Sequence, residues 1–443
     1  MITKKAYYPA CAIAFLSALF FGIVTIGQIY FQKDTYPVSR LFAGCDYFST
    51  YNATLCIGSG YTIYENIWLA PSETILKNMK ILGLVDYSGV SDDSWYCYPP
   101  LFAYLNSPLI FFDMETASRI MFFLLITAVL CAYFLTAVSF ESFMDHERTM
   151  MLLCGMVIVA LSHPFYFLIS RCHQVGIVFL LIGMGVYLLK RENVLCSICF
   201  ALAIGMIVFP VLILIPLLLF RRYVYVMLIL VFCALLILMA PDLWFEFFQR
   251  VVFERLGQAA YGIDNCSLAN TCRFVIMFVN NVFSSLGLPQ LSLLHVSEYA
   301  LAVYALLLCA MVIADVKIRK NCGVIGNEAE ICLTLMYFPF MIAIPGTSFY
   351  YNLVLLILLV PALCFMVRAV HTPVPPFIMW AIAGGIFLSQ MQVRIIQNLI
   401  DEQGSFFYFF PGFGLFTVMI GCVLLKWWIA GRGLHALQPT AAL

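Results

Sequence analysis

Two polar stretches of this 443-residue chain hold most of the side chains that could do chemistry. In the first, Asp46 follows Gly44-Cys45, where a long polar segment begins to turn helical. A carboxylate held there by local packing could act as the general base of a reaction at a lipid surface. It could also cap a short interfacial helix, because Asp is favoured at helix N-termini. The spacing alone leaves both roles open.

Tyrosines and carboxylates are interleaved along this first stretch, residues 31–97. It has seven carboxylates against four basic residues, a net charge of −3. Aromatic rings stack on the apolar faces of sugars and carboxylates bind sugar hydroxyls, so the pattern indicates a sugar-binding surface. Tyrosine is also favoured at membrane interfaces for packing reasons alone. The candidate substrate contacts are Tyr47, Tyr51, Tyr64 and Tyr98.

The second polar stretch, residues 241–294, offers side chains that suit a phosphate. Asn265 and Ser267 are neutral hydrogen-bonding groups, and Arg273 follows with a guanidinium that can bind two phosphate oxygens at once. Arg273 could instead extend from an apolar helix toward the interface. If both stretches lie on one side of a membrane, they can form a common site.

The composition limits where such a site can be. Hydrophobic residues make up 64% of the chain and charged residues only 10%, against roughly 25% in soluble domains, which excludes a water-soluble globule. Lys+Arg and Asp+Glu both number 23, so no basic field exists for nucleic acid. The 17 cysteines lie mostly in apolar runs, where a thiol packs as a small hydrophobe. We predict neither a metal site nor a cofactor.

Long apolar runs predict an all-α polytopic membrane protein of about twelve transmembrane helices, because each crossing needs about 20 apolar residues. Lys4 and Lys5 precede the first run and place the N-terminus in the cytoplasm, and an even count places the C-terminus there too. We expect a single domain, residues 1–443, in the plasma membrane, with 31–97 and 241–294 as extracytoplasmic loops. The runs are 9–30, 98–113, 116–140, 149–169, 173–189, 193–220, 222–240, 295–316, 330–346, 349–367, 375–395 and 411–430.

The count of spans leaves some segments with alternative interpretations. Counting every run as one crossing places 141–148 and Lys190-Arg191 outside, and for Lys190-Arg191 this conflicts with the preference of basic residues for the cytoplasm. The run 193–220 contains one glycine and two prolines and could form a broken pair of short helices, with a re-entrant segment near 98–112 to restore parity. The segment 273–289 is expected to be interfacial or re-entrant, because a further crossing there would move the next basic cluster outside.

Ionisable residues are scarce at the centres of the predicted spans. Asp315, Glu330 and Lys426 fall near span ends, and His163 lies well inside a run beside Pro164, where its ring could cap a freed carbonyl. An ion-coupled transporter normally needs ionisable groups at mid-membrane depth. The sequence therefore disfavours ion-coupled transport.

The order of elements over roughly residues 9–370 resembles glycosyltransferase family 87, polytopic enzymes of the GT-C class that use polyprenyl-phosphate sugars. In the first stretch the likeness rests on Asp46-Tyr47, Tyr51 and Gly60 to Tyr64. Further along it rests on Tyr98-Pro99-Pro100, Pro108, His173-Gln174, Lys190-Arg191, Pro210, Pro216, Arg221-Arg222, Asn265, Ser267, Leu268, Arg273, Ser348, Tyr350, Tyr351, Leu353 and Pro361. The chain departs from the family pattern before Pro210, where the usual lysine is missing, and in 347–352, which contains neither Trp nor His.

This resemblance implies an inverting transfer of one sugar, mannose by default, from a polyprenyl-phosphate donor to a lipid-linked or glycan acceptor on the outer membrane face. Asp46 would accept the proton of the attacking hydroxyl. The leaving phosphate would face Asp46 across one pocket, and no metal ion would be needed for a phosphomonoester. The implied donor-phosphate residues are Arg273, Asn265, Ser267, Tyr350 and Tyr351.

Two points stay open at the level of sequence. His173 and Gln174 belong to the family pattern, yet the simple count places them on the cytoplasmic side. A flippase or carrier for a lipid-linked sugar could use the same outer surface without chemistry. In either case the expected partners are a lipid-linked sugar and the bilayer.

Overall fold

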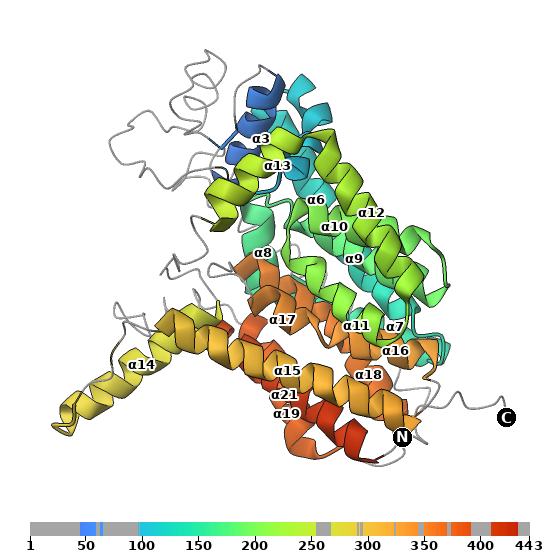
Figure 1. Ribbon diagram of the computed structural model, residues 1–443, viewed down its shortest axis with the longest axis vertical. Coiled ribbons are helices and arrows are strands. Elements are labelled where there is room, and N and C mark those ends of the chain that lie inside the picture. Colours follow the sequence, from blue (N-terminus) through green and yellow to red (C-terminus); the bar gives the residue numbers. More distant parts are fainter. Residues whose placement is uncertain are drawn as a thin grey trace.

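Every element in the described part of the chain is a helix (Figure 1). The computed structural model describes residues 45–58, 63–64, 96, 98–253, 267–289, 292, 296–322, 325–343, 350–369, 374–390 and 409–432. The α-helices are α3 (Cys45–Gly58), α5 (Pro100–Tyr104), α6 (Met114–Val138), α7 (Asp145–Leu161), α8 (His163–Ser170), α9 (Val175–Lys190), α10 (Leu195–Met206), α11 (Leu214–Leu219), α12 (Tyr223–Met239), α13 (Pro241–Glu246), α14 (Leu268–Ser285), α15 (Val296–Cys322), α16 (Asn327–Leu335), α17 (Phe338–Ala343), α18 (Leu359–Ala369), α19 (Pro376–Gln390) and α21 (Phe409–Arg432). Three 3-10 helices, η4 (Ser107–Phe111), η5 (Phe209–Ile213) and η7 (Tyr350–Leu358), and one π-helix, η6 (Phe247–Phe253), complete the set.

Helices α6 and α9 pack closely in the core. Helix α6 begins after Asp113, whose carboxylate accepts the backbone N–H of Thr116 at 3.0 Å and so caps the helix. In α9, Gly183 lies against the backbone of Ala132, and a methyl group on it would come within 2.7 Å of the Ala132 carbonyl oxygen. Glycine at this position therefore allows the two backbones to approach. The helices expected from the runs 116–140 and 173–189 are confirmed.

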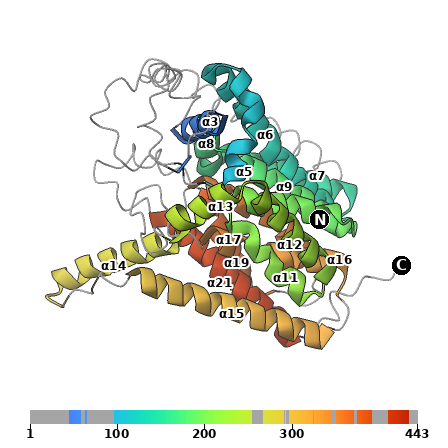
Figure 2. The same cartoon turned by 45° about the horizontal axis from the view of Figure 1, so that its top comes forward.

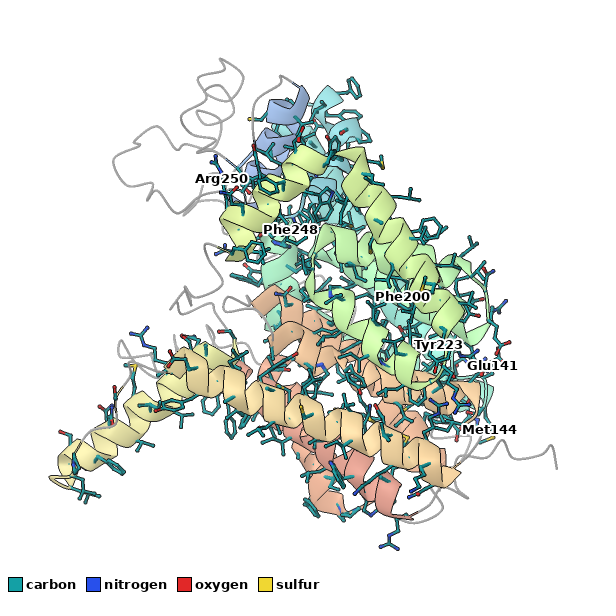
Figure 3. The ribbon with its side chains drawn as sticks, viewed as in Figure 1. Glu141, Met144, Phe200, Tyr223, Phe248 and Arg250 are labelled. Carbon is teal, nitrogen blue, oxygen red and sulfur yellow. The ribbon has the colours of Figure 1, made fainter. Side chains whose placement is uncertain are left out.

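One end of the bundle gathers ten of the described basic side chains, and we call it the basic end. Lys190 Nζ lies 3.6 Å from Glu328 Oε1 and 3.8 Å from Glu141 Oε2. Glu328 Oε1 also accepts the backbone N–H of Glu141 at 2.8 Å. The segments that follow α6, α9 and α15 therefore meet here, where Figure 3 shows Glu141, Met144 and Tyr223. The basic residues of this end are Arg148, Lys190, Arg191, Arg221, Arg222, Lys317, Arg319, Lys320, Lys426 and Arg432.

The run 193–220 is a broken hairpin and not one crossing. Helix α10 leaves the basic end, the chain turns through η5, and α11 returns. Arg222, just after α11, places Nε 2.9 Å from Glu330 Oε1 and one terminal nitrogen 3.2 Å from Glu192, just before α10. The break comes at Ile207, which is extended with φ −153° and ψ 125°. At 12 residues α10 is about 18 Å long, too short for a hydrocarbon core of ~30 Å.

Segment 98–112 also fails to form a full crossing. Its helical part, Pro100–Phe111, is again only about 18 Å long. The prediction of one crossing each for 98–113 and 193–220 is therefore wrong, because prolines and an extended residue divide the apolar runs. The simple count also puts 141–148 and Lys190-Arg191 on the opposite side from Arg222 and Glu330, and this separation is wrong, because all of them lie at one end of the bundle.

Several described helices are apolar enough to identify a membrane protein. Residues 116–138, 296–321 and 410–432 are each long and apolar enough to cross a membrane. Helix α12 with α13 and η6, bent by 104° near Pro241, adds a fourth if the bent pair is one span. Shorter apolar helices, such as α9, α10 and α19, accompany them. The total of about twelve spans stays a prediction, and the first run, 9–30, lies outside the described residues.

A buried ion pair joins α15 to α21 near the basic end. Asp315 Oδ2 lies 2.7 Å from Lys426 Nζ, and both side chains have an exposed fraction of 0%. Tyr337 donates its hydroxyl to the same carboxylate oxygen at 2.6 Å, and its ring lies 4.1 Å from Lys426 Nζ. The sequence places both charges near span ends but gives no sign that they pair.

Candidate active site

Aromatic side chains from separate segments meet at the end of the bundle away from the basic end. We call this the aromatic end; it comprises Tyr64, Tyr96, Tyr98, Phe102, His173 and Phe247. The Tyr98 ring stacks on Phe102 with centroids 4.6 Å apart, and the Tyr64 ring lies 6.0 Å from Phe247. Tyr64 belongs to the first polar stretch and Phe247 to the second. The two stretches are therefore in contact, as a common site requires.

Two of the predicted sugar-binding tyrosines use their hydroxyls to hold the backbone. Tyr51 donates to the carbonyl oxygen of Phe112 at 2.9 Å, and Tyr64 donates to that of Tyr98 at 2.9 Å. Both rings are buried. These bonds fix α3 and the first stretch to the segment that follows Tyr98. Tyr51 and Tyr64 therefore position other groups of this end.

His173 and Tyr98 form a buried hydrogen bond. His173 Nε2 lies 2.6 Å from Tyr98 Oη, and the backbone N–H of Val175 donates to His173 Nδ1 at 3.1 Å. Because Nδ1 accepts, the neutral ring carries its proton on Nε2 and donates it to Tyr98. Cys172, with φ 49°, makes the tight turn between α8 and α9. The simple count separates His173 and Gln174 from the first polar stretch, and this separation is wrong, because the turn lies at the aromatic end beside Tyr98.

Two predicted residues of this region keep a buried polar atom without a hydrogen-bond partner. Tyr47 Oη and Gln174 Oε1 are both in this state within the part of the chain that the structure describes. Burial raises the pKa of Tyr47, with smaller effects from Cys172 and Tyr51, so its hydroxyl stays neutral. Buried polar atoms are usually paired, so these two are suited to bond a ligand.

The backbone of Asp46 lies in the first turn of α3, but its side chain lies outside the described residues. Asp46 is the second residue of the helix, so it does not precede the helix as an N-cap would. A carboxylate in a first turn interacts favourably with the helix dipole. Helix α3 packs on α5, η4 and α6, which places the Asp46 backbone near the segments that form the aromatic end.

The predicted phosphate residues of the second stretch lie on another part of the bundle. Ser267 Oγ accepts the backbone N–H of Asn270 at 3.3 Å and caps α14, and Arg273 lies in the second turn. Helix α14 packs on α15 and α21, and it lies apart from α3 in both ribbon views (Figures 1 and 2). It covers most of the predicted segment 273–289 and is not among the helices apolar enough to span.

The other predicted donor residues can be placed only in part. Asn265 lies outside the described residues, and Tyr350 and Tyr351 open η7 with their side chains outside them too. The next residue, Asn352, is buried. Helix η7 packs mainly on α8, and also on α17 and α18. The backbone of this segment is therefore held beside the helix that leads to His173.

An aromatic run that the sequence analysis missed completes the aromatic end. Trp244 packs edge-on against Phe247 at 5.9 Å and stacks on Phe248 at 5.9 Å. The π-helix η6 that follows carries Arg250, and Figure 3 shows Arg250 and Phe248 at this end. π-helical turns are frequent at functional sites. The signal was present as one Trp and three Phe within the five residues from Trp244 to Phe248.

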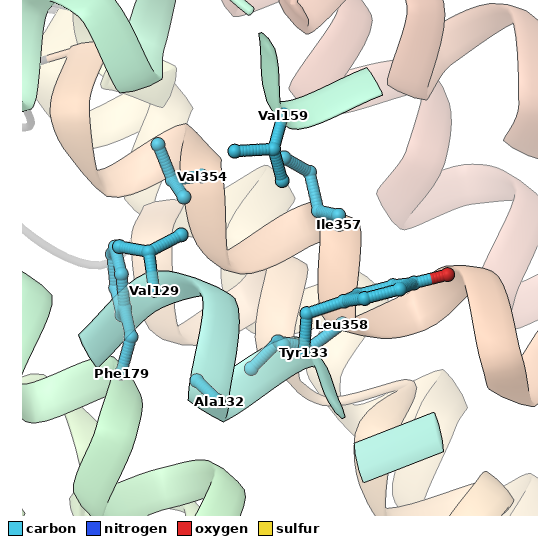
Figure 4. A pocket seen from close by; sticks show the side chains of 8 residues that line it. All are labelled: Val129, Ala132, Tyr133, Val159, Phe179, Val354, Ile357 and Leu358. Atoms are coloured by element: carbon cyan, nitrogen blue, oxygen red, sulfur yellow. The ribbon is translucent and has the colours of Figure 1, made fainter. Parts of the chain in front are cut away.

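A small cavity inside the bundle does not serve as the site (Figure 4). Its one polar side chain, Tyr133, donates its hydroxyl to the carbonyl oxygen of Met151 at 2.7 Å. The cavity therefore offers no polar group for sugar or phosphate. Its lining residues are Val129, Ala132, Tyr133, Val159, Phe179, Val354, Ile357 and Leu358.

Comparison with known proteins gives one family. The sequence model of glycosyltransferase family 87 matches residues 96–321, just over half of the chain. A search of curated proteins finds no match. The matched region contains Tyr98, His173, the hairpin, Phe247 and Arg273. It indicates a membrane glycosyltransferase and does not favour a passive carrier. The chain belongs to glycosyltransferase family 87.

Proposed function

We propose that the protein transfers one sugar, mannose as the first choice, from a polyprenyl-phosphate donor to a lipid-linked or glycan acceptor. Family membership carries this proposal, because it makes the chain a glycosyltransferase. The contact between Tyr64 and Phe247 supports the aromatic end as the reaction site. Basic residues favour the cytoplasmic side, so we place the basic end and both termini there. The aromatic end then faces outward from the plasma membrane.

The proposed reaction inverts the anomeric carbon. The acceptor hydroxyl attacks from the face opposite the phosphate, a new C–O bond forms, and the bond to the phosphate oxygen breaks. Asp46 accepts the hydroxyl proton as general base. Tyr47 and Gln174 offer a buried hydroxyl and a buried carbonyl oxygen to the sugar hydroxyls. The bond from His173 holds Tyr98 in a fixed orientation at the aromatic end.

The leaving phosphate is proposed to bind at the N-terminus of α14. Helix N-termini favour anions, and Ser267 and Arg273 lie at this end of α14. Asn265, Tyr350 and Tyr351 would add further donors. Because α14 and α3 pack on different helices, the proposal requires the two to close around one substrate.

The test of the general base is transfer by purified full-length protein, with radiolabelled polyprenyl-phosphate mannose as donor. Asp46→Asn should lower the rate by about 10² or more, because general bases contribute that much. Asp242→Asn is the matched control, since Asp242 is an exposed carboxylate at the start of α13. It should transfer at the wild-type rate. A rate in Asp46→Asn within tenfold of the wild type would remove Asp46 from this role.

The test of the phosphate site compares two substitutions of one residue. Arg273→Ala should weaken donor binding, and Arg273→Lys should recover only part of it, because lysine cannot bind two oxygens at once. Donor affinity is measured by the concentration dependence of transfer. Unchanged donor affinity in Arg273→Ala would remove Arg273 from the site.

The same labelled donor separates transfer from carriage. Release of free polyprenyl phosphate during the reaction supports a transferase. Movement of the donor between leaflets without release would support a carrier and contradict the proposed reaction.

A further inference from the structure

Helix α15 presents a long apolar face that other helices leave uncovered. Its membrane-length part is only 28% buried, against 50% and 61% for the corresponding parts of α6 and α21. Leu306, Ile313 and Val316 are 70%, 48% and 51% exposed. Their spacing of seven and three residues places them on one side of the helix. In a bilayer this stripe faces the acyl chains of lipids.

The stripe ends at cations on the same side of α15. Lys320 follows Val316 by four residues, and Lys317 follows Ile313 by four. Both lysines are exposed. An apolar surface that ends at positive charge is complementary to a phospholipid with an anionic headgroup: the surface contacts an acyl chain, and the cations contact the phosphate.

Two tryptophans of α21 hold this edge in place. Trp427 donates its indole N–H to the carbonyl oxygen of Ala310 at 3.1 Å, and Lys317 Nζ lies 4.1 Å over its ring. The Arg432 guanidinium lies 5.9 Å from the ring centroid of Trp428. Tryptophan is favoured at the headgroup level of membranes. The cations are therefore set at the depth of lipid phosphates.

Three other cations of the basic end are paired with carboxylates. Lys190 and Arg222 pair with glutamates, and Lys426 pairs with Asp315. No carboxylate pairs with Lys317, Lys320 or Arg432 among the described residues. The segments that directly follow α15 and α21 in the sequence, 323–324 and 433–443, contain no Asp or Glu. This edge therefore presents three cations with no carboxylate paired to them among the described residues.

We infer that the edge of α15 and α21 at the basic end is a binding site for an anionic phospholipid of the surrounding membrane. The phosphate lies against Lys317, Lys320 and Arg432, and one acyl chain follows the stripe from Val316 to Leu306. The site is distinct from the aromatic end and does not depend on the transfer reaction.

Native mass spectrometry of the full-length protein in detergent tests the assignment, with phosphatidylglycerol and phosphatidylcholine as probes. The wild type should retain phosphatidylglycerol in preference to phosphatidylcholine. Each lysine should contribute about fivefold in affinity, so Lys317→Gln with Lys320→Gln should lower phosphatidylglycerol binding about 25-fold. Arg191→Gln is the control, because Arg191 is an exposed cation of the same end that lies over Tyr187 on α9. It should bind as the wild type does.

Three results would overturn the inference. Equal retention of the two lipids by the wild type would show that charge does not select the ligand. Equal phosphatidylglycerol binding by the wild type and the double variant would place the lipid elsewhere. Displacement of phosphatidylglycerol by millimolar glycerol phosphate would assign the site to a free phosphate compound. The thermal denaturation of the double variant should match that of the wild type, because both lysines are exposed.

Discussion

Tyr47 and Tyr51 lie one helical turn apart on α3. Replacing each by Phe should change the free energy of unfolding in opposite directions. Tyr47 is fully buried, and its hydroxyl has no partner among the described residues. A buried polar group left unpaired costs about 1–3 kcal/mol. Tyr47→Phe removes that cost and leaves only a small gap. We expect the free energy of unfolding to rise by about 1 kcal/mol.

Tyr51→Phe is the matched control. Tyr51 is buried as well, but its hydroxyl donates to the carbonyl oxygen of Phe112 at 2.9 Å. A typical buried hydrogen bond contributes about 1 kcal/mol, so its loss should lower the free energy of unfolding by a similar amount. The ring, the helix and the substitution are the same in both variants. Only the state of the hydroxyl differs.

Thermal denaturation of the purified protein in detergent measures both effects. For 443 residues, 1 kcal/mol corresponds to about 1 °C, so the two variants should differ by about 2 °C in Tm. Tyr47→Phe should also lower sugar transfer about tenfold, if its hydroxyl bonds the substrate. A Tm of Tyr47→Phe as low as that of Tyr51→Phe would refute the argument. Sugar transfer by Tyr47→Phe at the wild-type rate would refute the contact of Tyr47 with the substrate and leave the stability argument intact.

Two further perturbations follow from buried or paired charges. Lys426→Met leaves the Asp315 carboxylate buried without its cation, so it should lower the free energy of unfolding by about 3–5 kcal/mol. Adding Asp315→Leu should recover most of that loss, and thermal denaturation measures both variants. The hydrogen bond from Arg222 lowers the pKa of Glu192, so the pair stabilises the fold above the ordinary pKa of 4.5 and loses this effect as the pH falls through the lowered value. Glu192→Gln should weaken the dependence of Tm on pH in this acid range, and an unchanged slope would contradict the pairing.

Composition and apolar runs were enough to predict a helical membrane protein, because lipid leaves few other ways to satisfy the backbone. The contact of the two polar stretches also followed from the sequence, since Tyr64 and Phe247 do meet. The role of Tyr51 was less accessible. The hydroxyl of Tyr51 bonds a backbone carbonyl, and that of Tyr47 has no hydrogen-bond partner among the described residues. The spacing of the tyrosines in the sequence does not distinguish these two states.

The hairpin and the buried ion pair needed three-dimensional information. A run of 28 apolar residues is long enough for one crossing, and its glycine and two prolines only make a break possible. The extended conformation of Ile207 and the contact of Arg222 with Glu192 show that the chain turns back. Asp315 and Lys426 are 111 residues apart, and their pairing depends on how α15 and α21 pack. Hydropathy reports how apolar a segment is, but it does not report where that segment reverses.

The basic dipeptides Lys190-Arg191 and Arg221-Arg222 flank this hairpin and meet at one end of the bundle. Because basic residues favour the cytoplasmic side, we expect both dipeptides to be retained on one side of the membrane during biogenesis, with the intervening segment inserted as a loop. A single translocated pass would invert every later helix, including the polar stretch that carries Arg273. On this expectation, four basic residues that need never touch a substrate decide the sidedness of the second half of the chain.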